Sequence, residues 1–306
     1  MSPPILRPFA PGDEAGILAL YREVFALHLT LDEWRWYFAG REPAVIALAE
    51  VDGQIIGHYA VQPRPFSVGP AGLVVGSMVA PAFRNLATFV GLARAAYAMC
   101  RERGIRFVYA FPNDNVWLVR QRMLDWVALP QIHALAAAVA DFRPTGPAGG
   151  ARLHPGQGFP SWAVGSPAVS ATLPSDWLAW RLHEKPGAPY PVYAHSDGYI
   201  ALKTYRPSEG PATGHLIDWR VRPGAEASVG SLLLAQAKAH FAQDGVERVS
   251  TWLLPASPLY PVARQAGLVE ESAGKNFGYL ALDPALSASG GLAGAWDIRM
   301  ADSDVY

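Results

Sequence analysis

The chain has 306 residues, a formal net charge of -1, 51% hydrophobic residues and a mean hydropathy of +0.11. This length exceeds the usual size of one hydrophobic core, so we expect two domains of roughly 150 residues each. The near-zero charge and the scattered basic residues argue against a nucleic-acid partner. No run approaches the roughly 18 apolar residues that span a bilayer, and the first residues lack a leader pattern, so we expect a cytoplasmic protein without a membrane span.

The first half predicts alternating strands and helices. Strand patterns alternate in hydrophobicity, helical patterns repeat every three to four residues, and Asp52-Gly53 is a strong hairpin signal. Glycine at 104 ends the longest helical pattern. In chain order we expect a strand at 5–9, helices at 17–24 and 31–38, strands at 44–50, 54–61 and 73–79, a helix at 86–104, a strand at 105–111, a helix at 117–124 and strands that end near residue 142.

The second half repeats this order after a change in composition. Residues 143–173 are rich in Pro, Gly, Ser and Ala, which is typical of a linker. We therefore expect domains at 1–142 and 174–306 joined by this linker. The second domain predicts a helix at 177–182, strands at 190–195 and 199–205 around Asp197-Gly198, a strand at 215–221, a helix at 229–241, a strand at 248–254, a helix at 259–266 and a strand at 276–282. A shared order indicates duplication of one unit.

Cys100 is the only cysteine, so the chain can build neither an internal disulfide nor a thiolate metal site. The helical pattern around it predicts a buried apolar thiol. The alternative, a catalytic nucleophile, requires a nearby base that no motif supplies. We expect no metal site.

Two segments carry a resemblance to a known family. The stretch from Val75 to Phe89 places Arg84 in a strand, turn and helix start, and it resembles the Arg-x-x-Gly-x-Gly/Ala loop of GNAT acetyltransferases. The sequence Phe-Pro-Asn-Asp-Asn at 111–115 is similar to a second signature of a bacterial branch of that superfamily, often associated with polysaccharides and amino sugars. Further similar positions are Trp34 to Tyr37, Trp180-Arg181 and Trp296 to Tyr306.

The resemblance implies an α/β (α+β) chain with two tandem GNAT-like domains, each a mixed, mostly antiparallel sheet flanked by helices. It also implies acetyl-CoA, or another acyl-CoA, as cofactor. The cofactor pyrophosphate would dock on free amides at a helix N-terminus, where small residues permit close approach. In the bacterial branch the arginine is followed by Gly-x-Gly, and here Asn85, which tolerates left-handed geometry, and Ala87 replace these glycines. The implied cofactor-binding residues are Met78, Val79, Arg84, Asn85, Leu86, Ala87, Thr88, Asn113 and Asn115.

The catalytic groups are harder to assign. Acyl transfer to an amine needs a stabilised oxyanion and a proton for the departing thiolate. The strand at 73–79 holds no carboxylate, and the helix at 117–124 lacks the tyrosine that many relatives use as acid. His58 and Tyr59, near the expected acyl cleft, and Asp114, beside the expected cofactor channel, are our candidates for proton transfer. Their alternatives are a structural or solvent-facing role for His58, packing for Tyr59, and helix capping for Asp114.

The second half has no such loop between residues 221 and 229, so we expect no second coenzyme site. Asp218, Trp219 and Trp180 are candidates for the wall of an acceptor cleft. We hypothesise an N-acyltransferase that acetylates a small amine, such as an amino sugar or an amino-acid derivative, and the chain could form a homodimer. One alternative is a catalytically inactive protein that binds coenzyme A, an acyl group or a partner; another is an enzyme that takes a longer acyl chain from an acyl carrier protein.

Overall fold

The computed structural model describes residues 3–161, 169–187 and 190–303, and the chain divides into two compact units. The first contains residues 1–130 and 276–293, and the second contains residues 131–275 and 294–306. The units are therefore interleaved along the sequence, whereas we expected consecutive domains at 1–142 and 174–306. The reason is a long-range strand pairing: the end of strand β13 (Val269–Ala281) pairs antiparallel with a strand of the first unit. Local sequence patterns do not report such pairings.

The sheet of the first unit is mixed and mostly antiparallel. Its strand order is β1-β2-β3-β4-β5-β13, and only the β4–β5 pair is parallel. Asp52 and Gly53 both have positive φ, 49° and 80°, as a tight hairpin turn between β2 and β3 requires. The strands are β1 (Ile5–Pro8), β2 (Val45–Val51), β3 (Gln54–Arg64), β4 (Ala71–Val79) and β5 (Phe107–Ala110).

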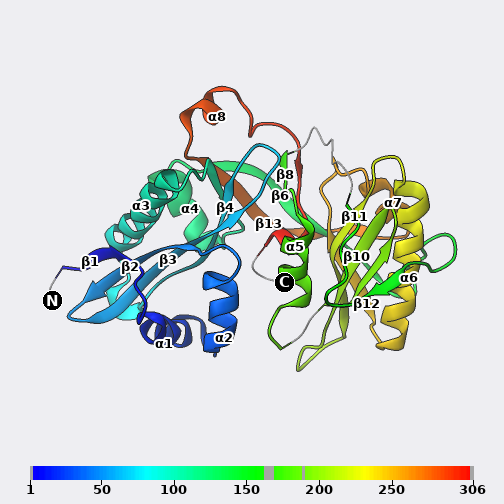
Figure 1. Cartoon of the computed structure of the whole chain (residues 1–306), viewed down its shortest axis with the longest axis horizontal. Helices are drawn as coiled ribbons and strands as arrows, with labels where there is room; N and C mark the ends of the chain where they lie inside the picture. The colour runs from blue at the N-terminus through cyan, green and yellow to red at the C-terminus, as the bar shows by residue number, and fades with distance from the viewer. Residues whose placement is uncertain (1–2, 162–168, 188–189, 304–306) are drawn as a thin grey trace. The chain divides into compact units, whose positions relative to one another are not determined.

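Helices cover both faces of this sheet (Figure 1). Adjacent residues of β3 show the two faces, because side chains alternate along a strand. The His58 ring lies 5.8 Å from Tyr21 of α1, whereas the Tyr59 ring lies 5.7 Å from Tyr97 of α3. The helices are α1 (Glu14–Phe25), α2 (Leu31–Trp34) continued by a π-helical turn (Arg35–Ala39), α3 (Leu86–Glu102), α4 (Asp114–Met123) and α8 (Pro284–Ala288).

The second unit repeats the element order of the first. Its sheet runs β13-β6-β12-β11-β10-β9-β7, with one parallel pair between β11 and β12, and a separate parallel pair joins β14 and β8. This repetition confirms two units of one mixed α/β architecture, each with a mostly antiparallel sheet flanked by helices. The strands are β6 (Val127–Ala138), β7 (Ala151–Leu153), β8 (Val169–Ser170), β9 (Val192–His195), β10 (Gly198–Tyr205), β11 (Thr213–Val221), β12 (Arg248–Trp252) and β14 (Trp296–Asp297).

The core of the second unit lies between its sheet and helices α6 and α7 (Figure 1). Trp219, Leu233 and Phe241 are fully buried in it. The segment that we expected to be a linker contributes β7 and β8 to this unit, so part of it belongs to the folded structure. The helices are α5 (Ser175–Leu178) continued by a π-helical turn (Ala179–His183), α6 (Ser231–Gln243) preceded by a π-helical turn (Glu226–Gly230), and α7 (Tyr260–Gln265).

Among the described residues, none of the helices combines the length and the apolar composition needed to cross a bilayer.

Candidate functional site

Strands β4 and β5 diverge and open a gap in the first unit. Their parallel pairing joins residues 71–73 to residues 107–109 and stops there, although β4 continues to Val79. The remaining half of β4 therefore has one edge that is not bonded to β5. An open strand edge presents backbone donors and acceptors to any extended ligand beside it.

A bulge in β4 lies at the start of this open edge. Tyr59 of β3 stands opposite both Gly76 and Ser77, because the antiparallel register shifts there. Gly76 has a left-handed φ of 55°, and a Cβ at this position would lie 2.0 Å from the Tyr21 hydroxyl. The His58 Nδ1 atom lies 2.7 Å from the Gly76 carbonyl oxygen and donates a hydrogen bond to it. Glycine is thus required at the bulge, and the hydrogen bond from His58 stabilises the bulge.

Val79 turns its backbone polar groups toward the gap. Ala80, the next residue, donates its N–H to the Ile56 carbonyl at 2.8 Å, which makes Val79 and Gly57 a pair that is not hydrogen bonded across the strands. The Val79 carbonyl instead accepts a 3.2 Å hydrogen bond from Arg84 Nε. Because the N–H and C=O of one strand residue point the same way, the Val79 amide also faces the gap.

The N-terminus of α3 opens toward the same gap. Asn85 caps the helix, and its Oδ1 accepts a 2.8 Å hydrogen bond from the Thr88 amide. Its φ of -151° is extended rather than left-handed, so we correct the expected reason for asparagine at this position: it caps the helix. The amides of Asn85, Leu86 and Ala87 have no hydrogen-bond acceptor within the described parts of the chain. Three donors therefore remain for an anion.

These features line a cleft of about 600 Å³. Seven of the nine expected cofactor-binding residues line it: Met78, Val79, Arg84, Asn85, Leu86, Asn113 and Asn115. Asn113 also caps α4, because its Oδ1 accepts a 3.1 Å hydrogen bond from the Val116 amide. The other lining residues are Val24, Phe25, Ser77, Phe89, Val116 and Val119, so the wall is mainly apolar. The structure therefore gathers most of the expected cofactor residues in one place.

The remaining expected site residues do not line the cleft. Ala87 is exposed at the helix start, and Thr88 is buried with its amide already bonded. Asp114 lies in the first turn of α4, and its Oδ1 accepts a 2.8 Å hydrogen bond from Asn276 of β13. Asp114 is not the α4 cap, which is Asn113, so the expected capping role is corrected.

His58 and Tyr59 are both fully buried, on opposite faces of β3. Burial lowers the pKa of His58 to about 4, so its ring is neutral at neutral pH. Burial also raises the pKa of Tyr59, which shares a 2.6 Å hydrogen bond with the Tyr97 hydroxyl. Neither side chain is a lining residue of the cleft, so their geometry supports a structural rather than a solvent-facing role for His58 and packing for Tyr59.

Sequence reasoning missed Ser77 in the wall of the cleft and Arg120, which bonds to it. Ser77 lines the cleft, and Arg120 of α4 donates a hydrogen bond from Nη2 to the Ser77 Oγ at 3.3 Å. Arg120 is 2% exposed. Helical spacing is the sequence signal for Arg120, because this residue follows Val116 by four positions and therefore lies on the same face of α4 as Val116.

Burial also decides the chemistry of Cys100. Its thiol is fully buried on α3, and burial raises its pKa to about 12. A thiol with this pKa is not ionised near neutral pH, so it is no nucleophile.

Comparison with known proteins places this geometry in a family. Residues 6–117 match the family model described as the acetyltransferase (GNAT) domain. This segment contains the bulge, the open edge of β4 and the start of α3. This part of the chain is therefore similar to a GNAT domain.

Solved structures are similar to this chain in fold. A conserved protein of unknown function from Enterococcus faecalis, described as a probable N-acyltransferase, aligns with a TM-score of 0.68 at 11% identity over 92% of this chain and 73% of that one. A GCN5-related glucosamine N-acetyltransferase region of a fungal multi-domain β-N-acetylglucosaminidase aligns with a TM-score of 0.60 at 15% identity, over 92% of this chain and 38% of that one. A tandem GNAT protein from the clavulanic acid biosynthesis pathway aligns with a TM-score of 0.54 at 13% identity, over 92% of this chain and 99% of that one. No curated protein sequence matches the chain.

The backbone of this matched segment has groups that suit an acyl-coenzyme A. The three free amides at the start of α3 suit a pyrophosphate, and the open edge of β4 suits the amide groups of a pantetheine arm. Arg84 adds a positive charge beside the helix start. The Thr88 amide, in contrast, is occupied by the Asn85 side chain.

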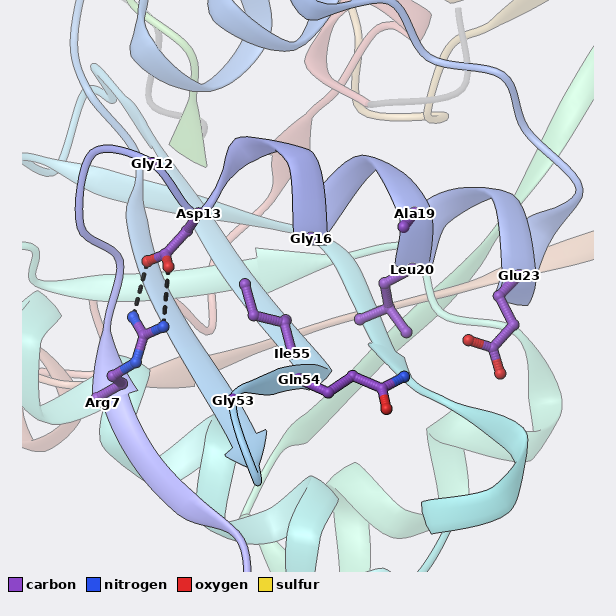
Figure 2. A pocket seen from close by; sticks show the side chains of 10 residues that line it. All are labelled: Arg7, Gly12, Asp13, Gly16, Ala19, Leu20, Glu23, Gly53, Gln54 and Ile55. Atoms are coloured by element: carbon purple, nitrogen blue, oxygen red, sulfur yellow. Dashed lines mark hydrogen bonds and ion pairs between the residues drawn. The ribbon is translucent and has the colours of Figure 1, made fainter.

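A second cavity of the first unit, of about 370 Å³, lies between α1 and the β2–β3 turn. Figure 2 shows Arg7 turned toward Asp13, with its Nη1 2.7 Å and its Nη2 2.8 Å from the two carboxylate oxygens. The hydrogen bond from Arg7 holds the pKa of Asp13 below its ordinary value, and Arg7 also binds Glu50 at 2.7 Å. The positive charge here is already neutralised, so this cavity offers no anion site.

In the second unit two parallel strands diverge in the same way, but side chains occupy the open strand edge and the helix start. Its β11–β12 pairing stops at Leu216, and β11 continues to Val221. Beyond that point the Trp219 carbonyl accepts a 3.2 Å hydrogen bond from the buried Arg299. At the start of the following helix, the Glu226 carboxylate accepts a 2.9 Å hydrogen bond from the Gly224 amide. A carboxylate at this position repels a phosphate.

The expected acceptor-wall residues of the second unit are buried. Asp218 and Trp219 are fully buried, and Trp180 is 7% exposed. Asp218 accepts a 2.6 Å hydrogen bond from Tyr199 and pairs with Arg220. Among the described residues, no group of three or more metal-ligating side chains comes together.

Proposed function

We propose that this chain is an N-acyltransferase that moves an acetyl group, or another short acyl group, from coenzyme A to the amine of a small molecule. One observation carries the proposal: the open edge of β4 and the start of α3, through Asn85 and Leu86, line a single cleft. We propose an amino sugar or an amino-acid derivative as the acceptor class. The fungal relative described as a glucosamine N-acetyltransferase supports the first of these.

Acyl-coenzyme A would supply the reactive thioester at this site. The amides of Asn85, Leu86 and Ala87 would hold its diphosphate, aided by the positive end of α3. The Val79 amide faces the cleft and would donate a hydrogen bond to the carbonyl oxygen, where negative charge develops during transfer. The apolar side chains of the cleft wall would displace water once the ligand is bound, which would strengthen that hydrogen bond.

The alternative function is a protein that binds acyl-coenzyme A without turnover. Two observations favour it: the Asn85 side chain takes the Thr88 amide, and the expected proton-transfer residues His58 and Tyr59 are buried away from the cleft. Calorimetric titration with acetyl-CoA, followed by an amine panel with a free-thiol readout, separates the two. Binding with thiol release supports the transferase, and binding without release for any amine supports the alternative.

Substituting Ala87 tests the diphosphate position. Ala87 is exposed in the first turn of α3, so Ala87→Glu adds a negative charge where acidic residues stabilise a helix. We expect at least a roughly tenfold weaker acetyl-CoA affinity without any loss of stability, because like charges repel at short range. Calorimetry measures the affinity, and thermal unfolding measures the stability.

Ala98→Glu, at an exposed position farther along the same helix, is the matched control. It adds the same charge away from the helix start and should leave affinity unchanged. Equal affinities for both variants and the unmodified protein would place the diphosphate elsewhere, and no measurable affinity in the unmodified protein would refute the proposed function.

A further inference from the structure

We propose that Ser77 donates a hydrogen bond to the sulfur of the leaving thiolate and that Arg120 is the positioning residue that makes it do so. The inference rests on the proposed function. It answers a question left by the sequence, since α4 has no tyrosine to serve as the acid and the histidine and tyrosine of β3 lie outside the cleft.

Arg120 is a buried cation without a carboxylate partner. It is 2% exposed, it forms no ion pair within the described parts of the chain, and its Nε and Nη1 atoms lack hydrogen-bond acceptors there. Its guanidinium lies over Trp126, with 4.7 Å from Cζ to the ring centroid. Burying a charge in this way is costly. A buried cation beside a ligand cleft is therefore suited to stabilise negative charge that arises there during a reaction.

The contact with Ser77 fixes how the hydroxyl is used. Arg120 Nη2 can only donate, so Ser77 Oγ must accept the 3.3 Å hydrogen bond. The hydroxyl hydrogen then points away from the guanidinium. Ser77 is half-buried and lines the cleft, and no other hydrogen bond of its hydroxyl occurs among the described residues. The hydrogen is therefore available to a ligand.

The other titratable groups around Arg120 do not compete for this role. Burial raises the pKa of Tyr59, from β3, and the pKa of Tyr97, from α3, so both stay neutral. Their hydroxyls bond to each other at 2.6 Å, and Trp126 donates to Tyr97 at 3.0 Å. Arg84, the other cation at the cleft, is bonded to the Val79 carbonyl. Ser77 is left as the hydroxyl donor that faces the ligand.

The position of Ser77 suits the sulfur. The helix amides that would hold the diphosphate follow Val79 in the chain, and Ser77 precedes it at the inner end of the open edge. During transfer the amine nitrogen bonds to the acyl carbon, and the carbon–sulfur bond breaks with its electron pair left on sulfur. The nitrogen loses one proton to water, and the sulfur later gains one from water. Ser77 keeps its own proton and stabilises the thiolate by hydrogen bonding.

The experiment compares four variants: Ser77→Ala, Arg120→Met, Arg120→Lys and the double variant Ser77→Ala/Arg120→Met. We expect Ser77→Ala to lower kcat by roughly 10- to 100-fold with little change in the KM for acetyl-CoA, because the hydrogen bond strengthens as charge develops. Arg120→Met should have a similar effect, and Arg120→Lys should recover part of it. The double variant should be no worse than Ser77→Ala alone, since Arg120 acts through Ser77.

A second readout does not depend on turnover. Coenzyme A with its free thiol is the probe, and ultraviolet absorbance follows ionisation of the bound thiol. We expect the thiol pKa in the complex to be about one unit higher in Ser77→Ala and in Arg120→Met than in the unmodified protein, because each loses stabilisation of the thiolate. Arg122→Met, an exposed arginine on the same helix, is the matched control and should change neither readout.

The outcomes separate the two proposals. Unchanged kcat and unchanged thiol ionisation in Ser77→Ala, with acetyl-CoA still bound, overturn the inference and leave the proposed function standing. Additive losses in the double variant also overturn it, since the two residues would then act independently. Absence of coenzyme A binding by the unmodified protein overturns both. If Arg120→Met does not fold, Ser77→Ala and Arg120→Lys still decide.

Discussion

Asn85 shows how one side chain both builds the candidate site and limits it. Its carboxamide caps α3, an interaction worth about 1 kcal/mol in helices generally. The same hydrogen bond removes the Thr88 amide from the donors that an anion could use, and three amides remain. A glycine would expose the fourth amide but would lose the side-chain cap, so asparagine favours stability of the helix start over the number of free donors.

His58 gives a prediction for pH dependence at the residue scale. Its folded-state pKa is about 4, below the ordinary value of 6.5, because of burial. A lowered histidine pKa means that stability is fully present above about pH 6.5 and is lost as pH falls toward 4. We expect His58 to contribute up to about 3 kcal/mol to the loss of unfolding free energy across this range. Urea unfolding at pH 7, 5.5 and 4 measures it.

The variant His58→Asn keeps a donor near the Gly76 carbonyl but does not titrate, so its unfolding free energy should fall less steeply over this range. His28→Asn, at an exposed position, is the control and should follow the unmodified protein. Identical pH dependence in His58→Asn and the unmodified protein would show that His58 is not the titrating group.

At the scale of elements, the bulge in β4 decides whether the cleft exists. Gly76→Ala would place a Cβ 2.0 Å from the Tyr21 hydroxyl at a φ of 55°. We expect a loss of about 2–3 kcal/mol in unfolding free energy and weaker acetyl-CoA binding, because strand and helix must shift apart. Chemical denaturation and calorimetry measure these two effects.

Two further variants separate the clash from backbone strain. Gly104→Ala has a similar φ of 72° but no atom within 4 Å of the new Cβ, so it should cost only about 1 kcal/mol. Adding Tyr21→Phe to Gly76→Ala removes the clashing oxygen and should restore part of the stability. If Gly76→Ala bound acetyl-CoA as well as the unmodified protein, the bulge geometry would not matter for the site.

The two Asp-Gly pairs differ in how well they predict the residues of the turn. Asp52-Gly53 forms the predicted hairpin turn, with positive φ at both residues. Around Asp197-Gly198 the hairpin also forms, but its turn is Ser196 and Asp197, and Gly198 already pairs with His195. A Cβ at Gly198 would lie 3.0 Å from the Arg220 carbonyl oxygen. Tertiary crowding, rather than turn geometry, therefore explains that glycine.

At the scale of the whole molecule, the two units share a fold but differ in their capacity for an anion. The first has free amides at the start of α3, whereas the second has the Glu226 carboxylate at the corresponding helix start and Arg299 on the Trp219 carbonyl. We therefore predict one coenzyme A per chain. Calorimetric titration gives the stoichiometry, and Ala87→Glu should weaken this single binding event at least roughly tenfold.

A stoichiometry of two would contradict this prediction, and so would one equivalent that binds Ala87→Glu with unchanged affinity. Ala98→Glu serves again as the control, with an expected stoichiometry of one. This comparison depends only on the occupancy of each unit, and it holds for any arrangement of the units in space.

The sequence by itself determined the element types, the repeated order, and the loop from Met78 to Leu86 together with Asn113 and Asn115, because periodicity, turn residues and motifs are local. Tertiary structure decided the rest. Pairing of β13 with β5 interleaved the two units, and strand alternation put His58 and Tyr59 on opposite faces, away from the cleft. Divergence of β4 from β5 exposed Ser77 with Arg120 behind it. These outcomes depend on contacts between residues far apart in sequence, which no local pattern encodes.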